Sequence, residues 1–185
     1  MRLYIKNMVC NRCIEAVEDE LRKLDITYSN IGLGYVDLDQ IIDDSNKSIV
    51  SDYLNKRGFE LLEDKKSQVI EQIKALVLES IQNSNKLTTN YSSYLEKGIG
   101  KDYNQLSTMF STVEGVTVER YIILQRLERV KELLIYNELT LSEIAYQTGY
   151  SSVHHLSNQF KKNIGMSPSQ FKKLHNPPRK PLDQV

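Results

Sequence analysis

The chain has 185 residues, of which 40% are hydrophobic and 26% are charged, and its formal net charge at pH 7 is zero. This length allows one large domain or two small ones, and the composition is ordinary for a globular protein. No segment approaches the roughly 18 apolar residues of a membrane helix, and the N-terminus lacks the apolar core of a signal peptide. We therefore expect a cytoplasmic protein with no membrane partner.

The zero net charge hides an asymmetry along the chain. Residues 1–66 contain ten Lys/Arg and thirteen Asp/Glu, whereas residues 67–185 contain fourteen and eleven. No acidic residue falls between Glu143 and Asp183, a stretch that contains several lysines. A locally basic surface indicates a polyanionic partner, although a solvated lysine face would look the same by charge alone.

The first 64 residues alternate between strand-like and helix-like patterns. A tight turn is predicted at Gly32–Gly34, and a second helix is expected to be capped by Ser45 and to end at Gly58. The first helix is expected to have Cys13 in its first turn and Ile14, Val17 and Leu21 on its apolar face. Strands are predicted over residues 2–6, 26–31, 35–38 and 59–62. The resulting order, βαββαβ, predicts an α+β domain of the ferredoxin-like type.

Strand signals end at Lys65, and the rest of the chain is predicted to be all-α. An amphipathic helix is expected from Lys65 to Ile81, followed by a polar linker over residues 83–86. Its apolar face could pack on the N-terminal domain or against a second copy of the chain, and we favour the homodimer. Further helices are predicted over residues 91–97, 103–113, 117–136, 140–149, 152–163 and from Ser167.

The segment 141–160 has the pattern of a helix-turn-helix unit. One helix ends at Gly149, a second begins at once, and the small Ala145 permits close packing. In such a unit the second helix enters the DNA major groove with its N-terminal residues leading. Residues 100–115 repeat the pattern about fifty residues earlier. The intervening helix over residues 117–136 would span roughly 30 Å, close to the roughly 34 Å between successive major grooves on one DNA face.

Three motifs in this half resemble the AraC-type bacterial transcription regulators: Glu128–Leu134, residues 143–162 and Gly165–Ser169. The resemblance covers about residues 85–174 and implies a double helix-turn-helix domain, with double-stranded DNA and RNA polymerase as partners. Contacts to DNA are expected from Tyr103, Asn104, Ser107, Thr108, Val153, His154, Ser157, Asn158 and Lys161. The last of these suits the DNA backbone, and Asn158 suits a base edge. Because no arginine falls at these positions, the bases that are read stay open.

Cys10 and Cys13 are the only cysteines and form a Cys-x-x-Cys motif at the start of the first predicted helix. In a reducing compartment such a pair indicates metal or redox chemistry before a structural disulfide. A helix N-terminus favours the thiolate form. Two thiolates suffice for a linear Cu(I) or Hg(II) complex but supply only part of a tetrahedral zinc site.

Residues 1–64 also resemble the heavy-metal-associated domain of copper chaperones and metal-transporting ATPases. The resemblance is carried by Met8–Cys10, Cys13, the pair Val17 and Glu18, and the pair Gly58 and Phe59. It implies that Cys10 and Cys13 bind the metal and that Met8 packs inward, while Asn7 stands where a glycine is common. A thiol redox response, another ligand and a purely structural role stay open for this domain.

We therefore predict a DNA-binding transcription regulator whose N-terminal domain senses a soft metal or the redox state. A thioredoxin-like oxidoreductase would need a proline loop, and the first 64 residues contain no proline. A metallochaperone-like protein would leave the repeated helix-turn-helix pattern unexplained. No Ser-His-Asp set, carboxylate pair or phosphate loop is present, so we expect no catalytic residues and no enzyme. The predicted parts are a heavy-metal-associated-like domain (1–64), a linker helix (65–84), a DNA-binding domain (85–175) and a disordered tail (176–185).

Overall fold

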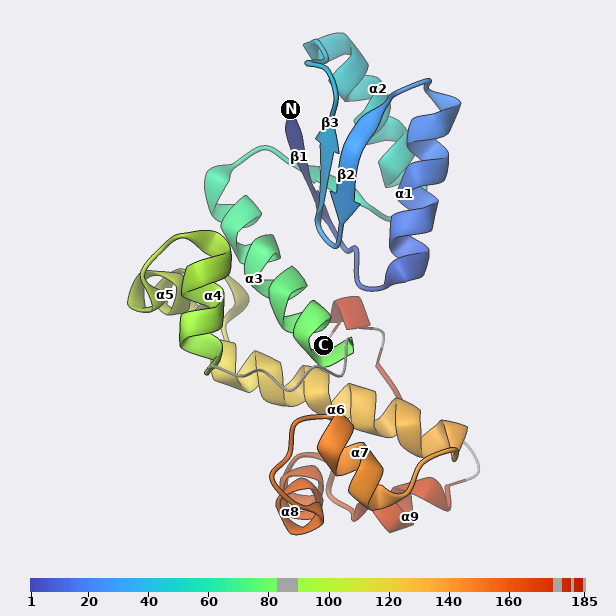
Figure 1. Cartoon of the computed structure of the whole chain (residues 1–185), viewed down its shortest axis with the longest axis vertical. Helices are drawn as coiled ribbons and strands as arrows, with labels where there is room; N and C mark the ends of the chain where they lie inside the picture. Colours follow the sequence, from blue (N-terminus) through green and yellow to red (C-terminus); the bar gives the residue numbers. More distant parts are fainter. Residues whose placement is uncertain (83–89, 175–177, 181, 185) are drawn as a thin grey trace.

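The computed structural model describes residues 1–82, 90–174, 178–180 and 182–184 (Figure 1). In Figure 1 a small sheet with its helices lies at the top, and a set of helices built around one long helix lies below it. Among the described helices, none combines the length and the apolar composition needed to cross a membrane.

The N-terminal unit has the predicted order of strands and helices. Its four strands form one sheet in the order β2-β3-β1-β4, with every neighbouring pair antiparallel. Alternate strand residues such as Leu3, Ile5 and Val36 are buried against α1 and α2, because side chains alternate between the two faces of a strand. The elements are β1 (Arg2–Lys6), α1 (Asn11–Lys23), β2 (Tyr28–Gly32), β3 (Tyr35–Leu38), α2 (Asp44–Asn55) and β4 (Glu60–Leu62).

Several boundaries in this unit differ from the prediction: α2 ends at Asn55 instead of Gly58, β2 ends at Gly32 instead of Ile31, and three other differences have a clear local cause. The cap of α2 is Asp43 rather than Ser45, because the Asp43 carboxylate accepts a hydrogen bond from the backbone N–H of Asn46 at 2.7 Å. Strand β2 begins two residues later than predicted because the N–H of Ile26 still bonds to a carbonyl of α1 at 3.0 Å. Strand β4 begins at Glu60 rather than at Phe59, because the N–H of Phe59 bonds to a carbonyl of α2 at 3.0 Å.

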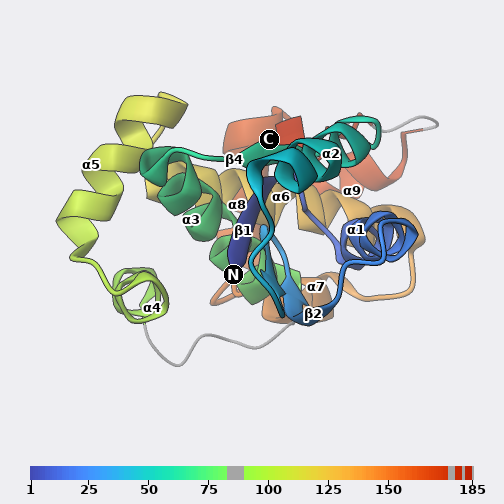
Figure 2. The same ribbon diagram turned by 90° about the horizontal axis from the view of Figure 1, so that it is seen from above.

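Helix α3 (Lys65–Gln82) belongs to two hydrophobic cores at once. Ala75 and Leu78 pack into the core of the N-terminal unit. Ile73 and Val77, which are both 0% exposed, pack into a second core together with residues of α4, α5 and α6. Figure 2 shows α3 between the sheet and the pair α4 and α5. Because both apolar sides are buried within one chain, this helix does not offer the face on which the expected homodimer was based.

The remaining helices follow the predicted order. They are α4 (Tyr91–Ile99), α5 (Tyr103–Glu114), α6 (Val118–Tyr136), α7 (Leu141–Gln147), α8 (Val153–Ile164), α9 (Pro168–Lys172) and the short 3-10 helix η1 (Leu182–Gln184). Helix α4 passes through Gly98, where we expected it to end, and ends at Gly100 with φ 74°. Gly98 instead makes room for α3, because a Cβ there would lie 2.6 Å from the Cδ1 atom of Leu76.

The described residues of the predicted tail lie beside α6. The backbone N–H of Lys180 donates to the Glu128 carboxylate at 3.3 Å, and the Gln125 amide donates to the carbonyl of Leu182 at 3.1 Å. These bonds hold the described tail residues along α6. Residues 176, 177, 181 and 185 of the predicted tail, and residues 83–86 of the predicted linker, lie outside the described part of the chain.

Replacing Ile73 by alanine tests whether α3 is a structural member of the chain. We expect Ile73→Ala to lower the free energy of unfolding by about 2–5 kcal/mol, because it leaves a cavity in a fully buried site. Lys66→Ala, at an exposed position of the same helix, should change it by less than about 0.5 kcal/mol. Urea denaturation of both variants provides the measurement, and equal small effects would contradict the packing of α3.

Candidate nucleic-acid interface and cysteine site

The two predicted reading helices are matched in length, ends and burial. Helices α5 and α8 each have 12 residues and begin fifty positions apart. Each ends at a glycine in the left-handed conformation, Gly115 with φ 70° and Gly165 with φ 85°. The buried, half-buried and exposed positions of residues 101–110 recur unchanged in residues 151–160. The predicted repeat is therefore confirmed, and it places two helix-turn-helix units in one domain.

Helix α6 joins the two units. Its first turns contribute Val118 and Tyr121 to the core of the first unit, and its later turns contribute Leu127 and Val130 to the core of the second. With 19 residues it is about 28 Å long. Figure 1 shows α5 at the left, α8 at the bottom, α6 between them, and the N-terminal unit at the top.

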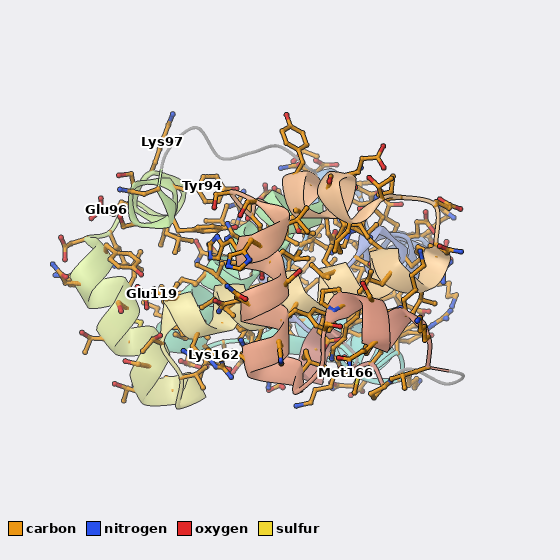
Figure 3. The ribbon with its side chains drawn as sticks, turned by 90° about the horizontal axis from the view of Figure 1, so that it is seen from below. Tyr94, Glu96, Lys97, Glu119, Lys162 and Met166 are labelled. Atoms are coloured by element: carbon orange, nitrogen blue, oxygen red, sulfur yellow. The ribbon has the colours of Figure 1, made fainter. Side chains whose placement is uncertain are left out.

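The nine predicted DNA-contacting residues all lie on α5 and α8. Figure 3, seen from below, shows these two helices on the same side of the domain, with the start of α6 between them. The exposed members of the set are Asn104, Thr108, His154, Asn158 and Lys161. The half-buried members are Tyr103, Ser107, Val153 and Ser157. Both α5 and α8 therefore present exposed polar side chains.

Asn158 and His154 are already paired on α8. The Asn158 amide nitrogen lies 2.9 Å from Nε2 of His154, one helical turn away. This contact restricts the rotamer of Asn158, so less side-chain entropy is lost when it contacts a partner. Lys161 and Lys162 extend from the last turn of the same helix, and Lys172 and Lys173 lie exposed nearby at the end of α9. The second unit is therefore the more basic of the two.

The first unit contains an acidic contact that the sequence analysis missed. The Tyr103 hydroxyl, in the first turn of α5, donates to the carboxylate of Glu119 in the first turn of α6. This hydrogen bond lowers the pKa of Glu119, while burial and the same carboxylate raise the pKa of Tyr103. Glu119 therefore stays charged between the two reading helices, where Figure 3 labels it. The sequence predicts only that an acidic residue is favoured at the start of a helix. It does not predict the contact of Glu119 with Tyr103.

A second contact links the two helix-turn-helix units. The guanidinium of Arg120, in the first turn of α6, donates to the side-chain oxygen of Asn163 near the end of α8. The Asn163 amide in turn donates to the carbonyl of Gln159 at 2.7 Å. The end of the second reading helix is thus linked to the start of the helix that completes the first unit.

The two cysteines lie where the sequence placed them, at the start of α1. Cys10 is the N-cap residue, Cys13 lies in the first turn, and their Sγ atoms are 3.6 Å apart without a disulfide. Met8 is 1% exposed, so its predicted inward packing is confirmed. Asn7 has φ 72°, a conformation that glycine adopts readily, and its side chain donates to the carbonyl of Gly58 at 2.9 Å. This explains how asparagine can stand where a glycine is common.

The Cys13 thiol does not have the low pKa expected from a helix start. Burial raises the pKa of Cys13, and this outweighs the backbone N–H groups that would stabilise the thiolate. Within the described residues, no group of three or more His, Cys, Asp or Glu side chains could hold a metal ion. The site therefore offers two sulfur ligands. With bonds of about 2.3 Å, the sulfurs would be about 4.6 Å apart in a linear complex and about 3.8 Å apart in a tetrahedral one.

Comparison with known proteins agrees with the geometry of the helical part. Residues 97–174 match the family described as a helix-turn-helix domain. The chain is 31% identical over 68 residues to the probable transcriptional regulator LumQ of Photobacterium leiognathi, covering 37% of this chain and 27% of that protein. It is 28% identical over 109 residues to the uncharacterized HTH-type transcriptional regulator YfiF of Bacillus subtilis (strain 168), covering 59% and 33%.

A solved structure shows the same likeness. The C-terminal domain of AraT, a response regulator from Geobacillus stearothermophilus, superposes with a TM-score of 0.52 and 25% identity, covering 60% of this chain and 88% of that one. The chain spans a third or less of the two curated relatives named above. Residues 97–174 thus resemble a helix-turn-helix domain, in agreement with the two units that the structure shows.

Proposed function

We propose that this protein is a sequence-specific DNA-binding transcription regulator. In this proposal α5 and α8 enter two successive major-groove segments of double-stranded DNA, and RNA polymerase is the further partner. The main support is the matched pair of helix-turn-helix units on α6, whose length of about 28 Å is close to the roughly 34 Å of one DNA turn.

The two reading helices make different kinds of contact in this proposal. On α8, Asn158 can donate to and accept from the edge of an adenine, and His154 holds it in place. Lys161 and Lys162 neutralise phosphates, which supplies affinity without sequence information. On α5, Asn104 and Thr108 are short and uncharged, so this helix contributes base contacts with little electrostatic attraction.

Replacing Asn158 by alanine separates base reading from backbone binding. Asn158→Ala should reduce the discrimination between a preferred duplex and a random duplex by on the order of 1–3 kcal/mol, because it removes a bidentate base contact. Duplexes enriched from a randomised library by the unmodified chain supply the preferred site, and fluorescence anisotropy supplies the affinities. Lys161→Ala is the matched control: it should weaken both duplexes equally and flatten the salt dependence. An equal loss for both duplexes in Asn158→Ala would reject the base-reading role.

Removing the charge of Glu119 should strengthen DNA binding. A carboxylate near the phosphates costs on the order of 1 kcal/mol in water, so we expect Glu119→Gln to increase affinity about fivefold at low salt. The gain should shrink at high salt because the charges are screened. Glu138→Gln, at an exposed position in the α6–α7 connection, makes the same charge change as a control and should have little effect. If both variants behave alike, Glu119 does not face DNA.

A second proposed function concerns the N-terminal unit. We infer that it is a ferredoxin-like domain that binds a soft ion through Cys10 and Cys13, and that this binding modulates the DNA-binding domain. The observation that favours it is the free pair of thiols 3.6 Å apart at the start of α1. Cu(I) or Hg(II) would need the sulfurs to separate by about 1 Å, and Zn(II) would need two further ligands. A disulfide-forming redox response is the alternative use of the same pair.

Native mass spectrometry with Cu(I), Hg(II) and Zn(II) tests the soft-ion site. Cys10→Ser and Cys13→Ser should each abolish tight Cu(I) binding rather than halve it, because one thiolate cannot form a two-sulfur complex. Binding should weaken as pH falls, since protons compete for the sulfurs, and the raised pKa of Cys13 extends that competition to higher pH. Equal metal uptake by the double serine variant would reject the site, and a DNA-affinity change that follows only oxidation would favour the redox response.

A further inference from the structure

A cavity of about 360 Å³ lies between the N-terminal unit, α3 and the first reading helix. The end of β1, strand β4 and the connection after β4 form one wall. The first half of α3 forms a second wall, and the last turn of α5 forms a third. Figure 2 shows α3 between the sheet and α5, so segments that are distant in sequence meet here. The volume falls within the range of small-molecule sites in proteins.

Glu71 of α3 is the most buried charged residue of these walls, with 6% of its surface exposed. The two lysines of the walls are each paired with another acid, Lys6 with Glu60 at 3.0 Å and Lys74 with Glu114 at 2.9 Å. The Glu71 carboxylate itself forms no hydrogen bond or ion pair with a described residue. Its oxygens are not sealed from solvent, so a molecule in the cavity can reach them.

The ionised form of Glu71 is poorly compensated in this position. Burial raises the pKa of Glu71, and the nearby Lys74 ammonium group and the backbone N–H of Asn7 lower it only in part. A buried carboxylate without a partner is costly, and a cationic group beside it offsets that cost. The unpaired carboxylate therefore points to a positively charged ligand.

The rest of the walls add negative charge and apolar surface. Five carboxylates line the cavity against two ammonium groups. Asp64 is exposed, accepts a hydrogen bond from the N–H of Ser67 at 2.8 Å, and forms no ion pair with a described residue. Leu61 and Val113 supply apolar surface on opposite walls. Within the described residues these acids do not converge as a metal site would require, so the charges of a ligand should be spread along a chain.

We propose that this cavity binds an aliphatic diamine, and that this ligand is an effector of DNA binding. One ammonium group lies against Glu71, the alkyl chain contacts Leu61 and Val113, and the other ammonium group lies toward the exposed Asp64. The effector role rests on the proposed DNA-binding function, whereas ligand binding does not. The site is separate from Cys10 and Cys13, which do not line this cavity.

The position of the cavity gives the ligand a route to the first reading helix. One wall is the last turn of α5, where Glu114 is already paired with Lys74 of α3. Another wall belongs to the N-terminal unit. A ligand that fits one arrangement of these walls better than another shifts the population toward it. The expected change in DNA affinity is about 5–150-fold, the usual range of allosteric coupling.

Isothermal titration calorimetry on the full chain, at constant ionic strength, tests binding with 1,4-diaminobutane and 1,5-diaminopentane. The matched controls are 1-aminopentane and 5-amino-1-pentanol, which carry a single charge on a chain of similar length. We expect at least one diamine to bind with a Kd below about 1 mM and more tightly than either monoamine. Asp64→Asn, which keeps a residue that can cap α3, should reduce the advantage of the diamine over the monoamines.

Replacing Glu71 by glutamine tests the deep end of the site. Glu71→Gln should weaken diamine binding by at least about tenfold, because the amide keeps the shape of the side chain but loses its charge. Glu79→Gln, at a half-buried position of the same helix outside the cavity, is the matched control and should leave binding unchanged. Glu71→Gln removes a poorly compensated buried charge, so its thermal unfolding midpoint should be no lower than that of the unmodified chain.

The proposed site is overturned if neither diamine binds with a Kd below about 1 mM, or if the monoamines bind as tightly. Equal binding by Glu71→Gln and the unmodified chain also overturns it. If Glu71→Gln does not fold, Asp64→Asn at the exposed end decides the matter, and an unchanged advantage of the diamine in that variant rejects the site.

Fluorescence anisotropy with the library-selected duplex tests the effector role. Diamines also bind DNA phosphates, so the unmodified chain and Glu71→Gln are compared at the same diamine concentration. We expect the diamine to change the DNA affinity of the unmodified chain by at least about fivefold more than that of Glu71→Gln. Equal changes in both overturn the effector role. A chain that binds no duplex rejects the proposed function instead, and the calorimetry still decides whether the site exists.

Discussion

The burial of α6 on two sides is the constraint on which the rest of the structure depends. Val118 and Tyr121 require the first helix-turn-helix unit to pack around the start of this helix, and Leu127 and Val130 require the second to pack further along it. A helix is far stiffer than a loop of equal length, so the spacing of α5 and α8 is set by packing in two cores. The contact of Arg120 with Asn163 adds a polar link between the same two units. A change in spacing therefore requires α6 or its packing to change, not merely a loop.

Helix α3 extends this constraint to the N-terminal unit. Because it contributes residues to the cores on both sides, the sheet and the first reading helix cannot move independently without exposing apolar surface. The start of α1 is held to the end of α3 through the bond from Gln82 to the carbonyl of Val9. The proposed chemistry at Cys10 would therefore act on a packed interface with few alternative arrangements. Packed interfaces of this kind switch between discrete states rather than deforming gradually.

The sequence predicted local features well and tertiary features poorly, for physical reasons. Caps, core spacing and left-handed glycines are encoded within a few residues, so the repeat of α5 and α8 and the order βαββαβ could be predicted. Ser45 was a reasonable cap, and Asp43 was preferred only because its carboxylate reaches the N–H three residues on. Gly98 marks the approach of Leu76 from another helix, and Glu119 acquires its role from Tyr103. Such pairings exist only after the chain has folded.

The charges on and near α5 and α8 affect how strongly the proposed regulator would bind DNA. The predicted base-reading positions include no arginine, and Glu119 keeps a negative charge between the reading helices. In the proposed DNA complex, electrostatic attraction would rest on a few lysines of the second unit, such as Lys161, so the sequence-independent part of the affinity would be modest. A protein whose specific sites compete with a large excess of random DNA is occupied according to the ratio of the two affinities. In the proposed regulator, a coupling of only one or two factors of ten between the N-terminal unit and α6 would move a half-saturated DNA site from mostly empty to mostly filled.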